Sequence, residues 1–324
     1  MLTVYSRYGN TISSTLLGPD DPFPPETFWI DLLEPTTSEE ASVEAYLNID
    51  VPTQEEMREI EPSSRLYQRG TTLFMTASVL NRADTHEPET RAITFILTEP
   101  VMTTVRYAEP TPFRTFPARI GTDPELFRSA ETTLVNLLDA IVDRIADTLE
   151  MVDATVGKLS TAIFTPLETS NAVNRDYSDE LRSIGLNAVR CSRVDESLVT
   201  LSRLLTFLDA HLRTGGHKET RARIKDLTRD IGSLSGYVER LSEKLELLLN
   251  ATLGMINIQQ TGIIKIFSVL AVVLLPPTLI ASIYGMNFDV MPELAWRYGY
   301  PMALLMMVIS AILPYWFFKR KGWL

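Results

Sequence analysis

The sequence is poor in the residues that build most metal centres and covalent frameworks. It contains one cysteine, Cys191, and three histidines, His86, His211 and His217. A single cysteine excludes an intrachain disulfide framework and a cysteine-rich zinc or iron–sulfur site, and the histidines do not stand at metal-ligand spacings. One cysteine also fits a reducing compartment.

Positive charge is scarce as well. The 324 residues carry 30 Lys and Arg against 41 Asp and Glu, a formal net charge of −11. A chain this acidic repels phosphate backbones, so nucleic acid is not an expected partner. We find no Ser/His/Asp set, Walker A phosphate loop or catalytic metal cluster. The sequence therefore predicts neither an enzyme nor a bound organic cofactor.

Two long uncharged runs occupy the end of the chain. They cover residues 266–284 and 298–318, and roughly 20 apolar residues match the hydrocarbon core of a bilayer at 1.5 Å of rise per residue. Two buried core helices are the alternative, but the short segments around the runs offer no soluble shell. We therefore expect two transmembrane helices in contact with membrane lipid, at 263–284 and 298–318.

The flanking charges predict the orientation of the two spans. Lys265 precedes the first span and the basic tail 319–324 follows the second, whereas the loop 285–297 contains Arg297 beside two acids. Positive charge stays on the cytoplasmic side. Both termini are therefore expected in the cytoplasm. The N-terminus also lacks the pattern of a secretory signal.

The long N-terminal part is predicted to be a cytosolic α+β domain, an α/β sandwich over residues 1–118. Strands are expected at 28–35 and 72–80, and a further pair within 92–108 is expected around a Glu99-Pro100 turn. Capping boxes at Thr37-x-x-Glu40 and Thr53-x-x-Glu56 indicate helix starts. The Pro-rich stretch 110–121 is interpreted as a linker.

Long helices are predicted to follow. Residues 119–216 are expected to form a helical hairpin, with helices from about 122 to 164 and 176 to 213. A stalk helix at 217–262 should run without a break into the first span, giving one helix over about 218–283. Its seam repeats by three and four residues and is mostly apolar: Ile224, Leu227, Ile231, Leu234, Val238, Leu241, Leu245, Leu248, Thr252, Met255 and Gln259. The seam can pack against further copies or, as the alternative, against the preceding helices of the same chain.

Two helices cannot enclose a pore, so a transporter built on them must be an oligomer. The sequence between the spans holds Gly285-Met286-Asn287, followed by Asp289 and Glu293. Gly285 and Asn287 could simply cap a helix. Alternatively, because Mg²⁺ loses its water shell reluctantly, a ring of Asn287 amides could bind the hydrated ion.

YGMNF closely followed by MPEL, between two terminal spans, resembles the CorA family of magnesium transporters. The similarity extends over IIKIFSV, LPPT, GYP and the terminal FKRKGWL. FWIDLLEP resembles the family's first strand. The resemblance implies a funnel-shaped homopentamer whose stalk helix continues into a pore-lining span. It also implies influx of Mg²⁺, Co²⁺ and Ni²⁺ across the bacterial inner membrane.

The resemblance assigns roles to residues near the membrane. Gly285, Met286 and Asn287 would form the selectivity filter, and Asp289 and Glu293 would concentrate cations at the external mouth. The pore lining and gate would consist of Thr261, Ile264, Phe267, Ala271, Leu275, Thr278 and Ser282. The hydroxyls of that set could instead bond their own helix backbone. Apolar rings could close such a pore by dewetting.

The resemblance also implies regulatory Mg²⁺ sites between neighbouring subunits, formed by carboxylates of the cytosolic part. The candidates on the stalk are Asp226, Asp230, Glu243 and Glu246, and those on the facing domain are Asp84, Glu87 and Glu89. A solvated acidic surface is the alternative for each of them. Two other functions stay open at this point: a zinc transporter of the same superfamily, and a membrane-anchored scaffold or sensor that conducts nothing.

Overall fold

The computed structural model describes residues 1–9, 11–59, 61–165, 175–212, 218–286, 291–292 and 296–322. These residues form two compact units. The first contains Met1–Ala162 and Arg182–Leu248, and the second contains Ile163–Leu181 and Leu249–Leu324. The predicted domain boundaries, drawn by position in the chain, stay predictions.

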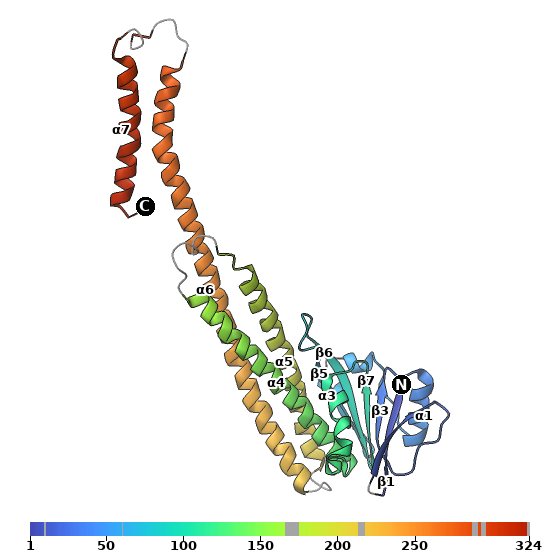
Figure 1. The fold of residues 1–324 in the computed structure, drawn as a ribbon. Coiled ribbons are helices and arrows are strands. Elements are labelled where there is room, and N and C mark those ends of the chain that lie inside the picture. The colour runs from blue at the N-terminus through green and yellow to red at the C-terminus, as the bar shows by residue number, and fades with distance from the viewer. Residues whose placement is uncertain are drawn as a thin grey trace. The chain divides into compact units, whose positions relative to one another are not determined.

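The first unit is built on one seven-stranded mixed sheet with the order β2-β1-β3-β7-β6-β5-β4 (Figure 1). Strands β3 and β7 run parallel, and the other neighbours are antiparallel. The strand bounds are Leu2–Tyr8 (β1), Thr11–Leu17 (β2), Thr27–Leu33 (β3), Leu66–Arg69 (β4), Thr72–Asn81 (β5), Glu89–Thr98 (β6) and Val101–Arg106 (β7).

The strongly apolar strands were predicted correctly. β3 and β5 cover the expected runs, and β6 and β7 flank Glu99-Pro100 as expected. The run FWIDLLEP contains β3, the third strand of this chain. The hairpin of β1 and β2 precedes it, and the many Ser and Thr residues of that hairpin gave no strong strand signal.

A buried ion pair joins the parallel strands at the centre of the sheet. The side chain of Arg106 donates through Nε to Oδ1 of Asp31 at 3.0 Å and through Nη2 to Oδ2 at 2.7 Å. Thr104 donates its hydroxyl to the same Oδ1 at 2.7 Å. Asp31 and Arg106 are 4% and 3% exposed. Because each charge is paired and hydrogen-bonded, the pair can be buried, and it fixes the register of β3 against β7.

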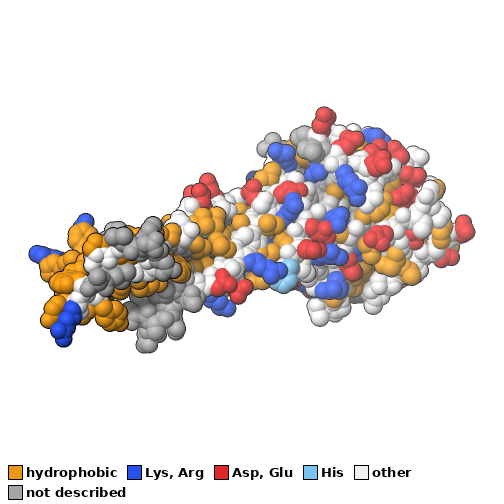
Figure 2. Space-filling model, turned by 90° about the horizontal axis from the view of Figure 1, so that it is seen from above, with side chains coloured by type: hydrophobic (Ala, Val, Ile, Leu, Met, Phe, Trp, Pro, Cys, Tyr) orange, Lys and Arg blue, Asp and Glu red, His pale blue; other side chains and the backbone are white. Residues whose placement is uncertain are grey.

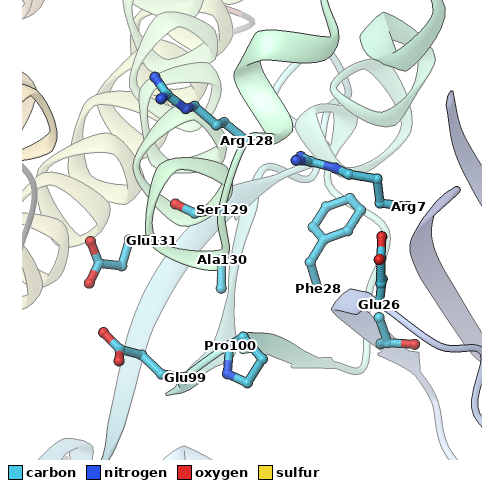
Figure 3. A pocket seen from close by; sticks show the side chains of 10 residues that line it. Arg7, Glu26, Phe28, Glu99, Pro100, Arg128, Ser129, Ala130 and Glu131 are labelled. Atoms are coloured by element: carbon cyan, nitrogen blue, oxygen red, sulfur yellow. The ribbon is translucent and has the colours of Figure 1, made fainter. Parts of the chain in front are cut away.

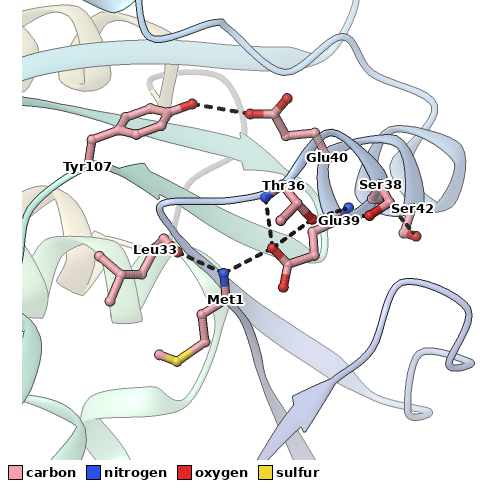
Figure 4. A network of polar contacts seen from close by, with 8 residues as sticks. All are labelled: Met1, Leu33, Thr36, Ser38, Glu39, Glu40, Ser42 and Tyr107. Carbon is pink, nitrogen blue, oxygen red and sulfur yellow. Dashed lines mark hydrogen bonds and ion pairs between the residues drawn. The ribbon is translucent and has the colours of Figure 1, made fainter.

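Helix α1 (Thr37–Leu47) begins one residue earlier than the predicted capping box implies. Thr36 is its N-cap: the Glu39 backbone N–H donates to the Thr36 hydroxyl, and the Thr36 N–H donates to the Glu39 carboxylate at 2.9 Å. The same carboxylate accepts from the Met1 ammonium, also at 2.9 Å, which draws Glu39 to the N-cap in place of Glu40 (Figure 4). Glu40 instead accepts from the Tyr107 hydroxyl at 3.1 Å.

Two other local predictions need correction. Thr53 and Glu56 do exchange capping hydrogen bonds, but they open only a single 3₁₀ turn, η1 (Glu56–Arg58). The stretch interpreted as a linker is ordered into α3 (Thr111–Thr115) and the 3₁₀ turn η2 (Pro117–Gly121), because Phe113 and Phe116 are buried there. The next long helix accordingly starts later than predicted, at Ala130 after the 3₁₀ turn η3 (Pro124–Phe127).

Three long helices follow the sheet along the chain: α4 (Ala130–Phe164), α5 (Ser178–His211) and α6 (Lys218–Tyr284). Within the first unit the α6 seam is covered by the same chain. Its buried members, each less than 5% exposed, are Ile224, Leu227, Ile231, Val238, Leu241, Leu245 and Leu248. Lys244 of α6 also reaches Asp153 of α4 at 3.3 Å. The heptad pattern up to Leu248 therefore reflects packing within the chain.

The second unit holds the two apolar helices. The continuous helix predicted from the stalk into the first span is confirmed, because α6 runs unbroken over 67 residues. Helix α7 (Gly299–Arg320) follows. Both are long and apolar enough to cross a membrane, and only 6% of the most apolar window of each is buried. Hydrophobic side chains dominate this part of the surface in Figure 2, whereas charged side chains gather on the other part.

Candidate functional site

The segment after α6 carries the predicted filter. Gly285 continues the last turn of the helix: its N–H donates to the Ala281 carbonyl at 2.9 Å, and a Cβ at this position would lie 3.1 Å from the same oxygen. Glycine thus lets the chain turn tightly. Met286 follows with 48% of its surface exposed. The predicted filter residue Asn287 and the mouth residues Asp289 and Glu293 lie outside the described residues.

The membrane part of α6 has two distinct faces. One face is sheltered by α7, which lies beside it in Figure 1. Just after α7, the Gly322 carbonyl accepts a hydrogen bond from Lys265 Nζ of α6. Val269 on this face is only 4% exposed, and Ala303 of α7 is only 6% exposed. Its partly or fully buried residues are Lys265, Val269, Val273, Pro276, Pro277, Ile280 and Tyr284.

All seven residues predicted to line the pore lie on the other face. Thr261, Ile264, Phe267, Ala271, Leu275, Thr278 and Ser282 are exposed in the chain. At 3.6 residues per turn their mean direction differs from that of the sheltered face by roughly 180°. Ile264, Phe267 and Leu275 expose 57%, 67% and 65% of their surface. The structure thus brings the seven residues onto one stripe that α7 leaves uncovered.

The hydroxyls on this stripe bond backward along the helix. Thr261 donates to the Asn257 carbonyl and Thr278 to the Leu274 carbonyl, each at 2.8 Å. These are the intrahelical bonds expected of Thr in an apolar helix. Each oxygen keeps acceptor capacity that it can offer to water.

The seven regulatory candidates do not converge in one chain. Asp84 forms an ion pair with Arg144, and Asp226 lies 3.4 Å from Arg229. Glu89 accepts from Arg91 at 2.6 Å and from Asn81. The Glu87 backbone N–H donates to Thr85, and Glu243 and Glu246 lie exposed on α6. Among the described residues, no group of three or more Asp, Glu, His or Cys side chains is placed to hold a metal ion.

An acidic row on α4 was not among the predicted site residues. Asp139, Asp143 and Asp147 follow one another at a spacing of four, so they share a helix face. The pKa of Asp139 is raised, mainly by partial burial and then by the negative charge of Asp143. The pKa of Asp143 is raised in the same way by partial burial and by the charge of Asp147. Asp230, one of the regulatory candidates, adds to both shifts from α6. The i, i+4 repeat of aspartates was the available signal.

A cavity of about 500 Å³ lies in the first unit (Figure 3). Arg7 and Arg128 border it on one side, Glu99 and Glu131 lie on another, and Phe28 points into its middle. Charges of both signs border it, and none of its residues belongs to the predicted site.

Comparisons with known proteins identify the family of this chain. The family model described as "CorA-like Mg2+ transporter protein" matches residues 26–320. The chain is 33% identical over 296 residues to the magnesium transport protein CorA of Pasteurella multocida, covering 91% of this chain and 92% of that one. It is 34% identical over 303 residues to CorA of Salmonella typhimurium, covering 92% of each.

Solved structures share the fold. The complete CorA magnesium transporter of Methanocaldococcus jannaschii matches with a TM-score of 0.77 at 17% identity, over 100% of this chain and 99% of that one. The full-length CmaX protein matches with a TM-score of 0.68 at 13% identity, over 100% and 98%. The family is one of transporters and not of enzymes. By the family match and the identity over nine-tenths of its length, the chain belongs to the CorA family of magnesium transporters.

Proposed function

We propose that this protein is a magnesium channel of the bacterial inner membrane, which admits hydrated Mg²⁺ down the membrane potential. The observation that carries the proposal is the two-faced first span of α6: α7 shelters one face, and the opposite stripe bears the residues assigned to the pore. A single chain cannot enclose water with one stripe. Several copies, five by the family resemblance, would turn their stripes toward a common axis.

The driving force is sufficient without a nucleotide. Moving one elementary charge through 100 mV is worth about 2.3 kcal/mol, so a divalent ion gains about 4.6 kcal/mol on entry into an inside-negative cell. Hydroxyls at Thr261, Thr278 and Ser282 can hydrogen-bond the water shell of the ion, so the shell need not be stripped. Apolar rings at Ile264, Phe267 and Leu275 would close the path when they exclude water.

Selection is assigned to Gly285, Met286 and Asn287 at the external end of α6. A ring of amide oxygens would bind the first water shell of Mg²⁺, while Asp289 and Glu293 would raise the local cation concentration. Co²⁺ and Ni²⁺, which carry the same charge, would also pass.

Regulation is assigned to cytosolic Mg²⁺ bound between neighbouring subunits. Among the described residues of one chain the acidic candidates do not form a site, so carboxylates of two chains would have to meet. Bound Mg²⁺ would offset their repulsion and hold the closed state. Protease resistance that is equal in EDTA and in millimolar Mg²⁺ would contradict this part of the proposal.

The filter assignment is tested with Asn287→Ala. We expect the variant to assemble normally and to lose Mg²⁺ uptake in reconstituted vesicles. Asn250→Ala makes the same change at an exposed position of α6 before the span, and it should transport normally. Near-normal uptake by the Asn287 variant would refute the filter role.

A further inference from the structure

Strand β2 is the last strand at one end of the sheet, and among the described residues no strand pairs with its outer edge. Its sequence lacks the features that usually protect such an edge. Thr11–Leu17 reads TISSTLL, with no charge and no proline over seven residues. It pairs with β1 without a register shift, so no bulge interrupts it. Natural sheets usually block an exposed edge with charges, prolines, bulges or short strands, because unpaired backbone groups recruit another strand.

The opposite edge of the same sheet shows the usual protection. Strand β4 has only four residues, Leu66–Arg69, and ends in a charged side chain. That residue, Arg69, pairs with Asp50 at 3.1 Å. The contrast within one sheet indicates that the open edge at β2 is a particular feature of this strand.

The free backbone groups of β2 can be assigned from the hydrogen bonds of its neighbour. The Arg7 N–H donates to the Glu26 carbonyl at 3.1 Å, so it points away from β2. Arg7 is the register partner of Ile12. Ladder bonds alternate along an antiparallel pair, so the backbone groups of Ile12, Ser14 and Leu16 are directed toward the open edge.

These three residues form a self-complementary pattern. If a second β2 pairs antiparallel about Ser14, then Ser14 lies opposite Ser14 of the other copy. Ile12 of each copy then lies opposite Leu16 of the other. Every outward backbone group then finds a partner, for about six hydrogen bonds. Leu16, which is 64% exposed in the single chain, gains an apolar neighbour, and cross-strand pairs of this kind stabilise sheets. No charged side chain of the strand opposes the contact.

We propose that β2 is a docking edge for β2 of a second copy of this chain, joined about a two-fold axis at Ser14. Such a contact is isologous and closes on itself. It therefore cannot build a ring of more than two subunits, and it would link a chain of one ring to a chain of a neighbouring ring.

The chain's single cysteine makes a direct test possible. Cys191 is buried, so Ser14→Cys supplies the accessible thiol. Opposed residues in a hydrogen-bonded antiparallel pair lie about 5.5 Å apart at Cα, which a disulfide can span. Under mild oxidation in dilute detergent, the full-length variant should form a disulfide-linked dimer of this chain. Gln68→Cys on β4 is the matched control at the protected edge and should form none.

A second variant separates pairing from folding. Leu16→Lys places a charge at an exposed position, so we expect normal assembly and transport. Combined with Ser14→Cys, it should reduce disulfide-linked dimer at least ten-fold. The proposal is overturned if Ser14→Cys links only to other polypeptides, if it links no faster than Gln68→Cys, or if Leu16→Lys leaves the yield unchanged. Because transport by Leu16→Lys is measured separately, failure here is distinguishable from failure of the proposed channel function.

Discussion

Shortening Leu275 should loosen the closed pore. Its side chain contacts little of its own chain, since 65% of its surface is exposed. Replacement by alanine removes about three carbons, worth about 0.8 kcal/mol each when buried. If neighbouring subunits bury the exposed two-thirds in the closed ring, the closed state loses about 1.6 kcal/mol per subunit. A change of about 1.4 kcal/mol is ten-fold in an equilibrium.

We therefore expect Leu275→Ala to raise isotopic Mg²⁺ uptake at least ten-fold in proteoliposomes that contain millimolar Mg²⁺ on the cytosolic side. The matched control is Leu270→Ala in the same span. Leu270 is 51% exposed and lies roughly 140° around the helix from Leu275, so it should change uptake less than two-fold. Equal effects of the two substitutions, or no effect of Leu275→Ala, would refute the assignment of this stripe to the pore.

Two further predictions concern the cytosolic part. Asp31→Asn should lower the free energy of unfolding of this part by about 3–5 kcal/mol, because it leaves the guanidinium of Arg106 buried without its charge partner. Urea titration of the full-length protein in detergent measures this loss. A loss below about 1 kcal/mol would contradict the prediction. Asp143→Asn should stabilise the protein at neutral pH, because burial and Asp147 raise the pKa of Asp143 in the folded state. The folded state therefore holds the Asp143 proton more tightly than the unfolded state does. The ionised carboxylate destabilises the fold at pH values above its folded-state pKa, and this destabilisation disappears as the pH falls toward the ordinary pKa of an aspartate. The gain in melting temperature should accordingly shrink on acidification, and a gain independent of pH would oppose this reasoning.

The sequence predicted best the elements with a strong hydrophobic pattern. The uncharged runs indicated both membrane helices. The strand around Asp31 stood out as an apolar run, FWIDLL, and the strands on either side of Glu99 and Pro100 stood out as apolar and β-branched runs separated by a turn. The β1–β2 hairpin was not recognised, since its serines and threonines alternate weakly with apolar residues. The capping box was displaced because Thr36 and Thr37 both have a glutamate three residues later, and only the tertiary contact between Met1 and Glu39 selects the first.

The candidate site was predictable in part. Helical periodicity alone places Thr261 to Ser282 on one stripe, but it cannot say which face α7 will cover. The heptad seam was ambiguous for the same reason: a repeating apolar row needs a partner, and α6 finds one within its own chain up to Leu248. The surroundings of the regulatory candidates were less predictable, because the partner of Asp84, Arg144, is 60 residues away in the sequence.

Flux through the purified protein tests the central claim most directly. Proteoliposomes with an inside-negative potassium diffusion potential should take up Mg²⁺ at a rate that increases with the potential, and Co²⁺ and Ni²⁺ should follow while Zn²⁺ enters more slowly. Uptake no faster than in protein-free liposomes, or a clear preference for Zn²⁺ over Mg²⁺, would contradict the account.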